Sequence, residues 1–262
     1  MSEPLVILEK RGHVLLMGLN RPHKRNAFVP DLIRELSLAY QRLAEDPDLR
    51  CGVLWAAGSD FTAGLDMPAI AKSIPLIPVK PLIPRGAIDP WGVNTKPCPK
   101  PIVTAVHGRC FTLGIELILS SQITVASDQA MFTQYEVSRG LFPFGGGTVR
   151  WAQSVGLNNA YRYLLTGDWF DAAEAYRLGL VQEVVPDGQQ LERAIEIAQT
   201  IAAQAPLGIA AILTSSRLAL DQGATTAFKQ INRQMIRIAL SRDLWRGIKA
   251  FRHKTTAQFQ GN

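Results

Sequence analysis

The sequence has few cysteines, no long apolar run and no large excess of one charge. Its three cysteines, Cys51, Cys98 and Cys110, are too few and too widely spaced for a disulfide scaffold, and their odd number favours free thiols in a reducing compartment. No segment reaches the roughly 18 uninterrupted apolar residues that a membrane span needs. The N-terminus lacks a basic stretch followed by an apolar stretch, so no secretory signal is visible. We therefore expect a cytoplasmic protein.

The composition that remains is that of a globular protein. The chain has 262 residues, of which 47% are hydrophobic and 19% charged, and this apolar content excludes disorder as the main state. The net charge of +6 is unevenly placed, because residues 229–254 hold eight basic side chains against Asp243 alone. Such a cluster is typical of a solvated helix face, but it also fits an anionic ligand or a nucleic acid.

Apolar periodicity predicts an α/β core followed by helices. Strands and helices alternate over the first three quarters of the chain, apart from a proline-rich stretch at residues 68–101 that we expect to cross the surface as a long irregular loop. The predicted strands are residues 5–10 and 13–19, which form a hairpin, then 52–56, 101–106, 123–126 and 131–132. The predicted helices are residues 31–43, 113–120, 151–155, 190–203, 207–220 and 226–251. The order indicates an α/β core with a helical C-terminal appendage.

Several familiar motifs are missing. The turn at Gly145, Gly146 and Gly147 is not followed by the lysine of a phosphate-binding loop, so we expect it to pack closely against the next helix. The four histidines are scattered and do not cluster with the cysteines at metal-ligand spacing, so no metal site is predicted. The Gly-x-Ser-x-Gly turn of many hydrolases does not occur.

Two carboxylates stand in unusual surroundings. Glu116 interrupts the apolar run of residues 112–119, and Glu136 follows a short predicted strand. A carboxylate in an apolar run is costly to bury unless it is paired or neutralised. From the residues alone, each glutamate is either a structural hydrogen-bonding group or part of an active site.

Six blocks of sequence resemble the enoyl-CoA hydratase/isomerase (crotonase) superfamily, and they cover nearly the whole chain in the order typical of that family. They are residues 19–28, residues 58–67 with Gly64-Leu65-Asp66, residues 100–117 with Lys100-Pro101 and Glu116-Leu117, residues 136–148 with Gly145-Gly146-Gly147-Thr148, residues 165–181, and residues 247–261 ending in Phe259-Gln260-Gly261. The resemblance implies a spiral of β-β-α turns over residues 1–195. It also implies a helical oligomerisation region over residues 196–262, which assembles trimers or hexamers.

The resemblance also implies a chemistry. Members of the superfamily bind acyl-CoA thioesters and stabilise an enolate with two backbone N–H groups, which correspond here to Leu65 and Leu113. Glu116 and Glu136 match the two glutamates of the hydratases, so we expect hydration of a 2-enoyl-CoA, with Glu136 as the more direct acid/base and Glu116 holding the water. Coenzyme A would enter as part of the substrate, with no further cofactor and no metal.

The resemblance further implies where coenzyme A binds. The corresponding residues are Lys24, Arg25 and Ala63 in or near the first oxyanion loop (residues 58–67, the second being residues 100–117), and Phe251 and Lys254 near the C-terminus, the last two often serving a neighbouring subunit. Cations beside aromatic surface suit the phosphates and adenine of coenzyme A. We expect no nucleic-acid partner and no membrane partner.

One departure from the family leaves alternatives open. The second oxyanion loop usually has consecutive glycines where this chain has Thr112-Leu113-Gly114, and a bulky Leu113 would alter the acyl pocket. An enoyl-CoA isomerase, or a hydrolase that cleaves a carbon–carbon bond in a β-diketone without coenzyme A, is therefore the main alternative. A non-enzymatic RNA-binding relative is a further one.

Overall fold

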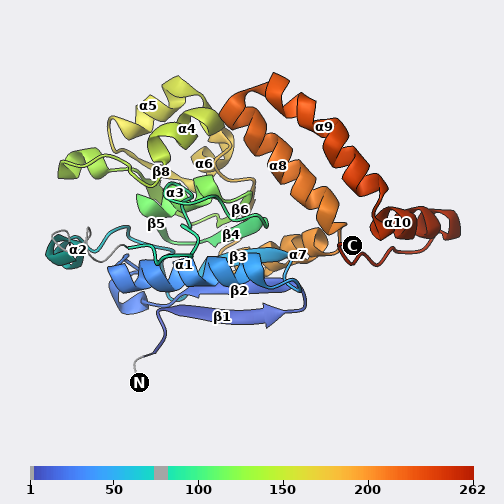
Figure 1. The fold of residues 1–262 in the computed structure, drawn as a ribbon. Coiled ribbons are helices and arrows are strands. Elements are labelled where there is room, and N and C mark those ends of the chain that lie inside the picture. Colours follow the sequence, from blue (N-terminus) through green and yellow to red (C-terminus); the bar gives the residue numbers. More distant parts are fainter. Residues whose placement is uncertain (1–2, 74–81) are drawn as a thin grey trace.

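The computed structural model describes residues 3–73 and 82–262, and its strands form two sheets (Figure 1). The larger sheet has the order β1-β2-β3-β4-β6-β9, and the smaller has the order β5-β7-β8. The strands of the larger sheet are β1 (Val6–Arg11), β2 (Val14–Leu19), β3 (Cys51–Ala56), β4 (Ile102–Val106), β6 (Ile123–Ser127) and β9 (Glu183–Val185). Those of the smaller sheet are β5 (Arg109–Phe111), β7 (Met131–Thr133) and β8 (Trp169–Asp171).

Consecutive strands in the middle of the chain enter alternate sheets. β4 lies in the larger sheet and β5 in the smaller one, and α3 (Leu113–Ser120) follows; β6 and β7 repeat this path before the next helices. β1 and β2 form the predicted antiparallel hairpin, while the other neighbours in the larger sheet are parallel. This is the predicted spiral of β-β-α turns, and it is confirmed.

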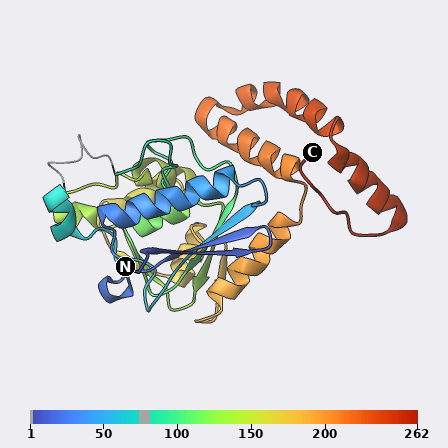
Figure 2. The same ribbon diagram turned by 60° about the horizontal axis from the view of Figure 1, so that its bottom comes forward.

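Helices cover both faces of the larger sheet (Figures 1 and 2). On one face, α1 (Pro30–Glu45) buries an apolar stripe against β1 and β2. On the other face, α7 (Gln190–Ala202) contacts β2, β3, β4 and β6 through a stripe of small and branched residues. The boundary that we predict between residues 195 and 196 falls within α7, and the division into two regions stays a prediction.

The proline-rich stretch differs from the expectation in two ways. It begins with a helix, α2 (Met67–Ser73), and part of it lies inside the protein rather than across its surface. Trp91 is only 5% exposed, and its ring packs edge-on against Phe28 at 5.3 Å between centroids. A large aromatic side chain buries enough apolar surface to hold an otherwise irregular segment in place. Residues 74–81 of the stretch lie outside the described part of the chain.

Three helices lie between the last strands of the core. These are α4 (Gly147–Val155), α5 (Leu157–Leu164) and α6 (Ala172–Leu178). Only the first was predicted, and from residue 151 rather than 147. The short strands β5, β8 and β9, of three residues each, were not predicted either.

The C-terminal region extends away from the core as α8 (Pro206–Gln222), α9 (Ala224–Ala239) and α10 (Arg242–His253) (Figure 2). The single helix predicted over residues 226–251 is wrong, because the chain breaks at Leu240 and Ser241. The Ser241 hydroxyl accepts a hydrogen bond from the N–H of Leu244 and so begins α10. The final residues return toward the core, where Arg50 donates to the carbonyl of Phe259 at 2.7 Å.

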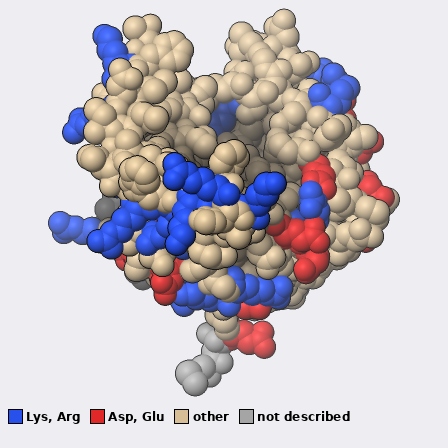
Figure 3. Space-filling model, turned by 90° about the vertical axis from the view of Figure 1, so that its right-hand side faces the viewer, with Lys and Arg blue, Asp and Glu red and all other residues tan. Residues whose placement is uncertain are grey.

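The basic cluster of residues 229–254 is therefore shared between α9 and α10 rather than carried by one helix. Nearly all of its basic side chains are exposed, and Figure 3 shows Lys and Arg gathered across this end of the molecule. Within the described residues, no single helix is both long and apolar enough to cross a membrane. Only α7 and α8 taken together would pass on length and composition, and they meet at a bend of 105°.

Candidate active site

The first candidate oxyanion loop, residues 58–67, is held in place by hydrogen bonds to residues 26–28. Asn26, fully buried, donates from Nδ2 to the carbonyls of Ala57 and Asp60, both at 2.8 Å. Phe28 then donates its N–H to the carbonyl of Gly64 at 2.7 Å and accepts from the N–H of Asp66 at 3.0 Å. Successive N–H groups of an extended chain point to opposite sides. The N–H of Leu65 therefore points away from Phe28, and no hydrogen bond is recorded for it within the described residues.

The second candidate loop ends at the first turn of α3. Thr112 donates its N–H to the carbonyl of Thr133 at 2.9 Å, and Leu113 is the first helical residue, so its own N–H has no partner within the helix. The positive end of the helix dipole lies at this turn. The two loops touch, since a Cβ added to Gly64 would lie 2.0 Å from Oγ1 of Thr112.

The unusual backbone of this loop is at Thr112 rather than at Leu113. Thr112 has φ 50° and ψ −111°, a left-handed conformation that glycine adopts freely and a β-branched residue rarely adopts. Leu113 itself is the first residue of α3 and has no positive φ. Strain of the kind seen at Thr112 costs on the order of 1–3 kcal/mol.

Leu65 and Leu113 both line one apolar cavity of about 280 Å³. Ile33, Ile70 and Trp91 contribute apolar walls, and Gly145 closes part of one side. The cavity has the size and lining of a small acyl pocket, and its lining includes both candidate oxyanion residues. The bulky side chain of Leu113 forms part of the lining, as its sequence position suggested.

Glu116 lies next to Gly145 of this lining. Its side chain is fully buried on α3, Oε1 accepts a hydrogen bond from the N–H of Gly147 at 2.7 Å, and Oε2 has no partner. Gly145 and Gly147 approach so closely that a Cβ on either would lie 2.9 Å from an oxygen of this carboxylate. The glycine turn does pack closely, but at Gly145 and Gly147 the group it meets is the carboxylate of Glu116 on α3, whereas we predicted contact with the next helix.

Glu136 presents the same pattern. It begins a 3-10 helix (Glu136–Arg139), is 6% exposed, and accepts at Oε1 from Nε2 of Gln134 at 2.8 Å, while Oε2 is buried without a partner. Gln134 is itself fully buried and accepts at Oε1 from the indole N–H of Trp151 at 3.2 Å. Each glutamate thus has one oxygen held by the protein and one left for another partner.

The two glutamates are electrostatically coupled. The pKa of Glu116 is raised to about 7, chiefly by burial and in part by the negative charge of Glu136, against the lowering effect of the Gly147 N–H. Burial also raises the pKa of Glu136, which the hydrogen bond from Gln134 opposes. A carboxylate with a pKa near neutrality can hold or release a proton at working pH, as an acid/base group requires.

The predicted coenzyme A residues fall into two groups. Arg25 accepts at its carbonyl from the N–H of Ala63 at 2.9 Å, so Lys24, Arg25 and Ala63 lie beside the first loop, with both cations exposed. Phe251 and Lys254 lie on and just after α10, at the opposite end of the molecule from α2 (Figures 1 and 2). Phe251 is 87% exposed. The single chain does not bring these two residues to the cavity.

Sequence reasoning missed several residues that build the site. Gln134, Trp151 and Trp91 hold it through hydrogen bonds that run between distant segments, and nothing in their local pattern indicated this. The three cysteines are free and buried. Among the described residues, no three His, Cys, Asp or Glu side chains form a group that could hold a metal.

Solved structures define the fold class. A probable enoyl-CoA hydratase/isomerase from Mycobacterium abscessus superposes with a TM-score of 0.94 at 46% identity, covering 98% of this chain and 99% of that one. An enoyl-CoA hydratase from Mycobacterium tuberculosis superposes with a TM-score of 0.89 at 30% identity, covering 99% and 100%. The protein therefore has the fold of these enzymes.

Sequence comparison identifies the family. The family described as Enoyl-CoA hydratase/isomerase matches residues 9–262. Enoyl-CoA hydratase EchA19 of Mycobacterium tuberculosis is 36% identical over 99% of this chain and 97% of its own length. The 2,3-dehydroadipyl-CoA hydratase of Escherichia coli is 31% identical over the full length of both chains. The chain belongs to the enoyl-CoA hydratase/isomerase family, which confirms the predicted family and enzyme class and supports hydration of enoyl-CoA in general.

Proposed function

We propose that the protein adds water to 2-enoyl-CoA thioesters, giving 3-hydroxyacyl-CoA, with Glu116 and Glu136 as the acid/base pair. The observation that carries the proposal is the matched state of the two carboxylates. Each is buried, each has Oε1 fixed by an N–H donor, and each has an unpartnered Oε2. A water molecule that accepts and donates at two such oxygens meets the need of both buried groups.

In the proposed reaction, the oxygen of this water bonds to the β-carbon of the substrate and one of its protons passes to Oε2 of Glu136. The carbon–carbon double bond becomes an enolate, whose α-carbon then takes a proton from the pair. The remaining water proton stays on the new hydroxyl group. Glu116, protonated near neutral pH, holds the water by donating to or accepting from it, and the pair ends with the number of protons with which it began.

The enolate oxygen is proposed to lie between the N–H groups of Leu65 and Leu113. Both donors are fixed before substrate arrives, one by the contacts of its neighbours to Phe28 and the other by its place at the start of α3. Donors aimed in advance at a developing charge are worth about 3–4 kcal/mol of barrier each. The acyl chain would occupy the apolar cavity of about 280 Å³ that both residues line.

Coenzyme A is proposed to lie over Lys24, Arg25 and Ala63, with Phe251 and Lys254 of a second subunit closing over it in a homotrimer or hexamer. Large apolar side chains exposed on α9, on α10 and at the break between them support such an assembly: Phe228 at 67%, Met235 at 60%, Leu240 at 83% and Trp245 at 65%. Light scattering tests this step. The expected mass is three or six times the 28.8 kDa of one chain.

The activity is tested by mixing purified protein with crotonyl-CoA and with longer 2-enoyl-CoAs. We expect the absorbance of the conjugated thioester to disappear and the product to gain the mass of one water. An isomerase would leave the mass of the substrate unchanged, which separates the two reactions. If folded protein consumes none of the chain lengths, the proposal is wrong.

A further inference from the structure

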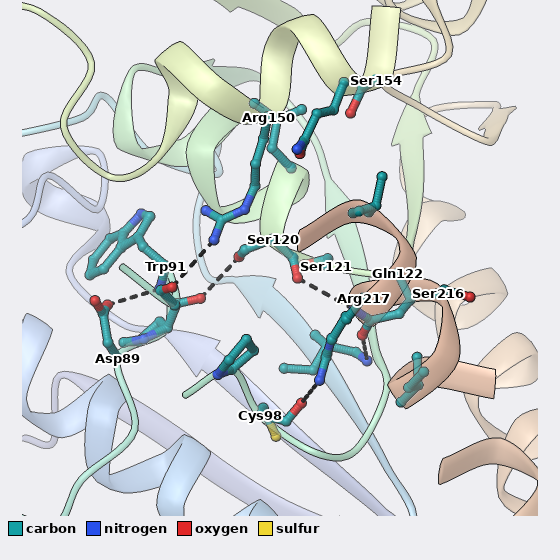
Figure 4. A pocket seen from close by; sticks show the side chains of 18 of the residues that line it. Asp89, Trp91, Cys98, Ser120, Ser121, Gln122, Arg150, Ser154, Ser216 and Arg217 are labelled. Carbon is teal, nitrogen blue, oxygen red and sulfur yellow. Dashed lines mark hydrogen bonds between the residues drawn. The ribbon is translucent and has the colours of Figure 1, made fainter. Parts of the chain in front are cut away.

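A second cavity of about 340 Å³ lies between α8 and the core (Figure 4). Its lining includes Tyr40 of α1, Trp91 and Cys98 of the proline-rich stretch, Arg150 of α4 and Arg217 of α8. Its volume is within the range of small-molecule sites. The proposed reaction does not use it.

Two arginines enter this cavity without a carboxylate partner. Figure 4 shows the guanidinium groups of Arg150 and Arg217 directed into it from two different helices. Arg150 donates to the carbonyls of Gly145 and Gly92 at 3.2 and 3.4 Å, and Arg217 donates to that of Cys98 at 2.8 Å. Both side chains are half-buried, and burial lowers the pKa of both. Guanidinium groups stay charged in proteins, so an anion that entered this cavity would meet two positive charges.

Asp89, Glu116 and Asp221 attract these arginines through space, but none of them forms an ion pair with either guanidinium group within the described residues. Asp89 accepts hydrogen bonds from the N–H groups of Trp91, Val93 and Asn94 and from the amide of Asn94, so its charge is already met by these donors. Asp221, on α8, is exposed at the edge of the cavity.

Tyr40, from α1, also lines this cavity. The hydroxyl group of Tyr40 is buried and has no hydrogen-bond partner, and the side chain is only 2% exposed. Burial raises the pKa of this hydroxyl far above its usual range, so it keeps its proton and can donate. A buried donor without an acceptor costs about 1–3 kcal/mol. Such a cost is removed when a ligand supplies the acceptor.

We propose that this cavity binds a carboxylate group, with the guanidinium groups of Arg150 and Arg217 and the hydroxyl of Tyr40 as its donors. Planar guanidinium groups match the two oxygens of a carboxylate in geometry as well as charge. A water molecule would give the hydroxyl an acceptor but would bring no negative charge to the two guanidinium groups. A small organic acid satisfies all three groups and fits the volume.

The bound carboxylate can belong to a free acid or to the acyl chain of a substrate, because the second cavity and the acyl cavity share part of their lining. Asp89 and Trp91 line both, and the indole N–H of Trp91 donates to the carbonyl of Leu113 at 3.0 Å. A free carboxylic acid would reach the second cavity from solvent. Alternatively, the far carboxylate of a dicarboxylic acyl chain would reach it from the acyl cavity by displacing Trp91, and this source rests on the proposed function.

Titration calorimetry with acetate and with succinate tests the free source. We expect saturable binding of at least one acid to the wild-type protein, no binding of uncharged succinamide, and affinity weakened about tenfold or more in Arg217→Gln and Tyr40→Phe. Arg237→Gln, at an exposed site on α9, is the matched control and should bind as the wild type does. Circular dichroism and thermal unfolding establish that the variants are folded.

Kinetics test the other source. A 2-enoyl-CoA with a far carboxylate is compared with the unsubstituted ester of equal chain length. A preference in kcat/KM for the acidic substrate that disappears in Arg217→Gln and Tyr40→Phe supports the proposal. No saturable binding of either free acid, together with no such preference, overturns it. A failure of the proposed function gives a different result, because then neither ester is hydrated. In that case the calorimetry with free acids alone decides whether the second cavity binds a carboxylate.

Discussion

Gln134 fixes which oxygen of Glu136 can exchange a proton. Its amide nitrogen donates to Oε1 of Glu136 at 2.8 Å, and its amide oxygen accepts from the indole of Trp151 at 3.2 Å. An indole N–H only donates, so the amide oxygen must face Trp151 and the amide nitrogen must face the glutamate. Oε1 of Glu136 is therefore the acceptor of the hydrogen bond from Gln134. Any proton that Glu136 takes or gives must move at Oε2, which has no other partner.

The first prediction concerns proton exchange at Oε2 of Glu136. Glu136→Gln replaces the exchanging oxygen with a group that cannot act as acid or base, while its amide oxygen can still accept from Gln134. Turnover of a 2-enoyl-CoA should fall by about 10²–10⁴. Steady-state kinetics on crotonyl-CoA measures the loss, with Glu192→Gln, at an exposed site, as the control. Unchanged turnover would exclude Glu136 as the acid/base group.

Removing the indole donor tests the orientation itself. Trp151→Phe keeps an aromatic ring in the core but leaves the Gln134 amide free to turn its oxygen toward Glu136. We expect kcat to fall about tenfold with little change in KM, and the pH profile of kcat/KM to shift. Loss of one hydrogen bond of about 1 kcal/mol or slightly more sets this scale. The control is Trp169→Phe, where the side chain is 56% exposed. Identical pH profiles for the two variants would contradict an orienting role.

The third prediction concerns the glycine turn. Alanine at Gly147 would place a Cβ 2.9 Å from Oε1 of Glu116, so the carboxylate must shift although the backbone has no positive φ there. A misplaced catalytic group costs up to about 10²-fold in rate. We expect Gly147→Ala to lose kcat by about 10–10²-fold while its far-ultraviolet circular dichroism stays unchanged. Gly208→Ala, whose Cβ would meet no atom closer than 4.0 Å, should keep full activity.

The parts of the fold that could be predicted are those with a strong local pattern. The helix over residues 113–120 and the hairpin of β1 and β2 follow from apolar periodicity over six or more residues. β5, β8 and β9 have three residues each and exist only because distant partners pair with them. The break at Ser241 gave no proline or glycine signal. It depends on a hydroxyl cap that only the folded helix reveals.

Some residues of the candidate site could be predicted from the sequence and others could not. Glu116 and Glu136 could be singled out because a carboxylate among apolar residues is unusual. Gln134, Trp151 and Tyr40 could not, because a buried amide, indole or hydroxyl is ordinary in sequence. Their importance lies in which atom each one faces, and that depends on the packing of α1, α4 and β7.

Relief of backbone strain gives the fourth prediction. Thr112 has φ 50° and ψ −111°, so glycine there removes strain on the order of 1–3 kcal/mol and adds unfolded-state freedom worth about 1 kcal/mol. Thr112→Gly should therefore raise the free energy of unfolding by up to about 2 kcal/mol. Thr112→Ala loses the same outer atoms but retains Cβ, and it should give no such gain. Urea unfolding of both variants measures the difference, and a glycine variant less stable than the alanine variant by about 1 kcal/mol would show that the conformation costs nothing.

The last prediction concerns how stability changes with pH because the pKa of Glu116 is raised in the folded protein. The folded protein holds this proton up to about pH 7, whereas the unfolded chain releases it near 4.5. Between these values the native state binds more protons, so the contribution of Glu116 to stability falls as pH rises, by about 3 kcal/mol in all.

Glu116→Gln removes this titration and keeps an oxygen for the N–H of Gly147. The variant should match the wild type near pH 4.5 and be more stable than it above pH 7, whatever its loss of activity. Urea unfolding at several pH values measures the difference, with Glu192→Gln expected to follow the wild type throughout. Parallel curves for Glu116→Gln and the wild type would mean that the carboxyl group is already charged at pH 5, and the proposed protonated role of Glu116 would then fail.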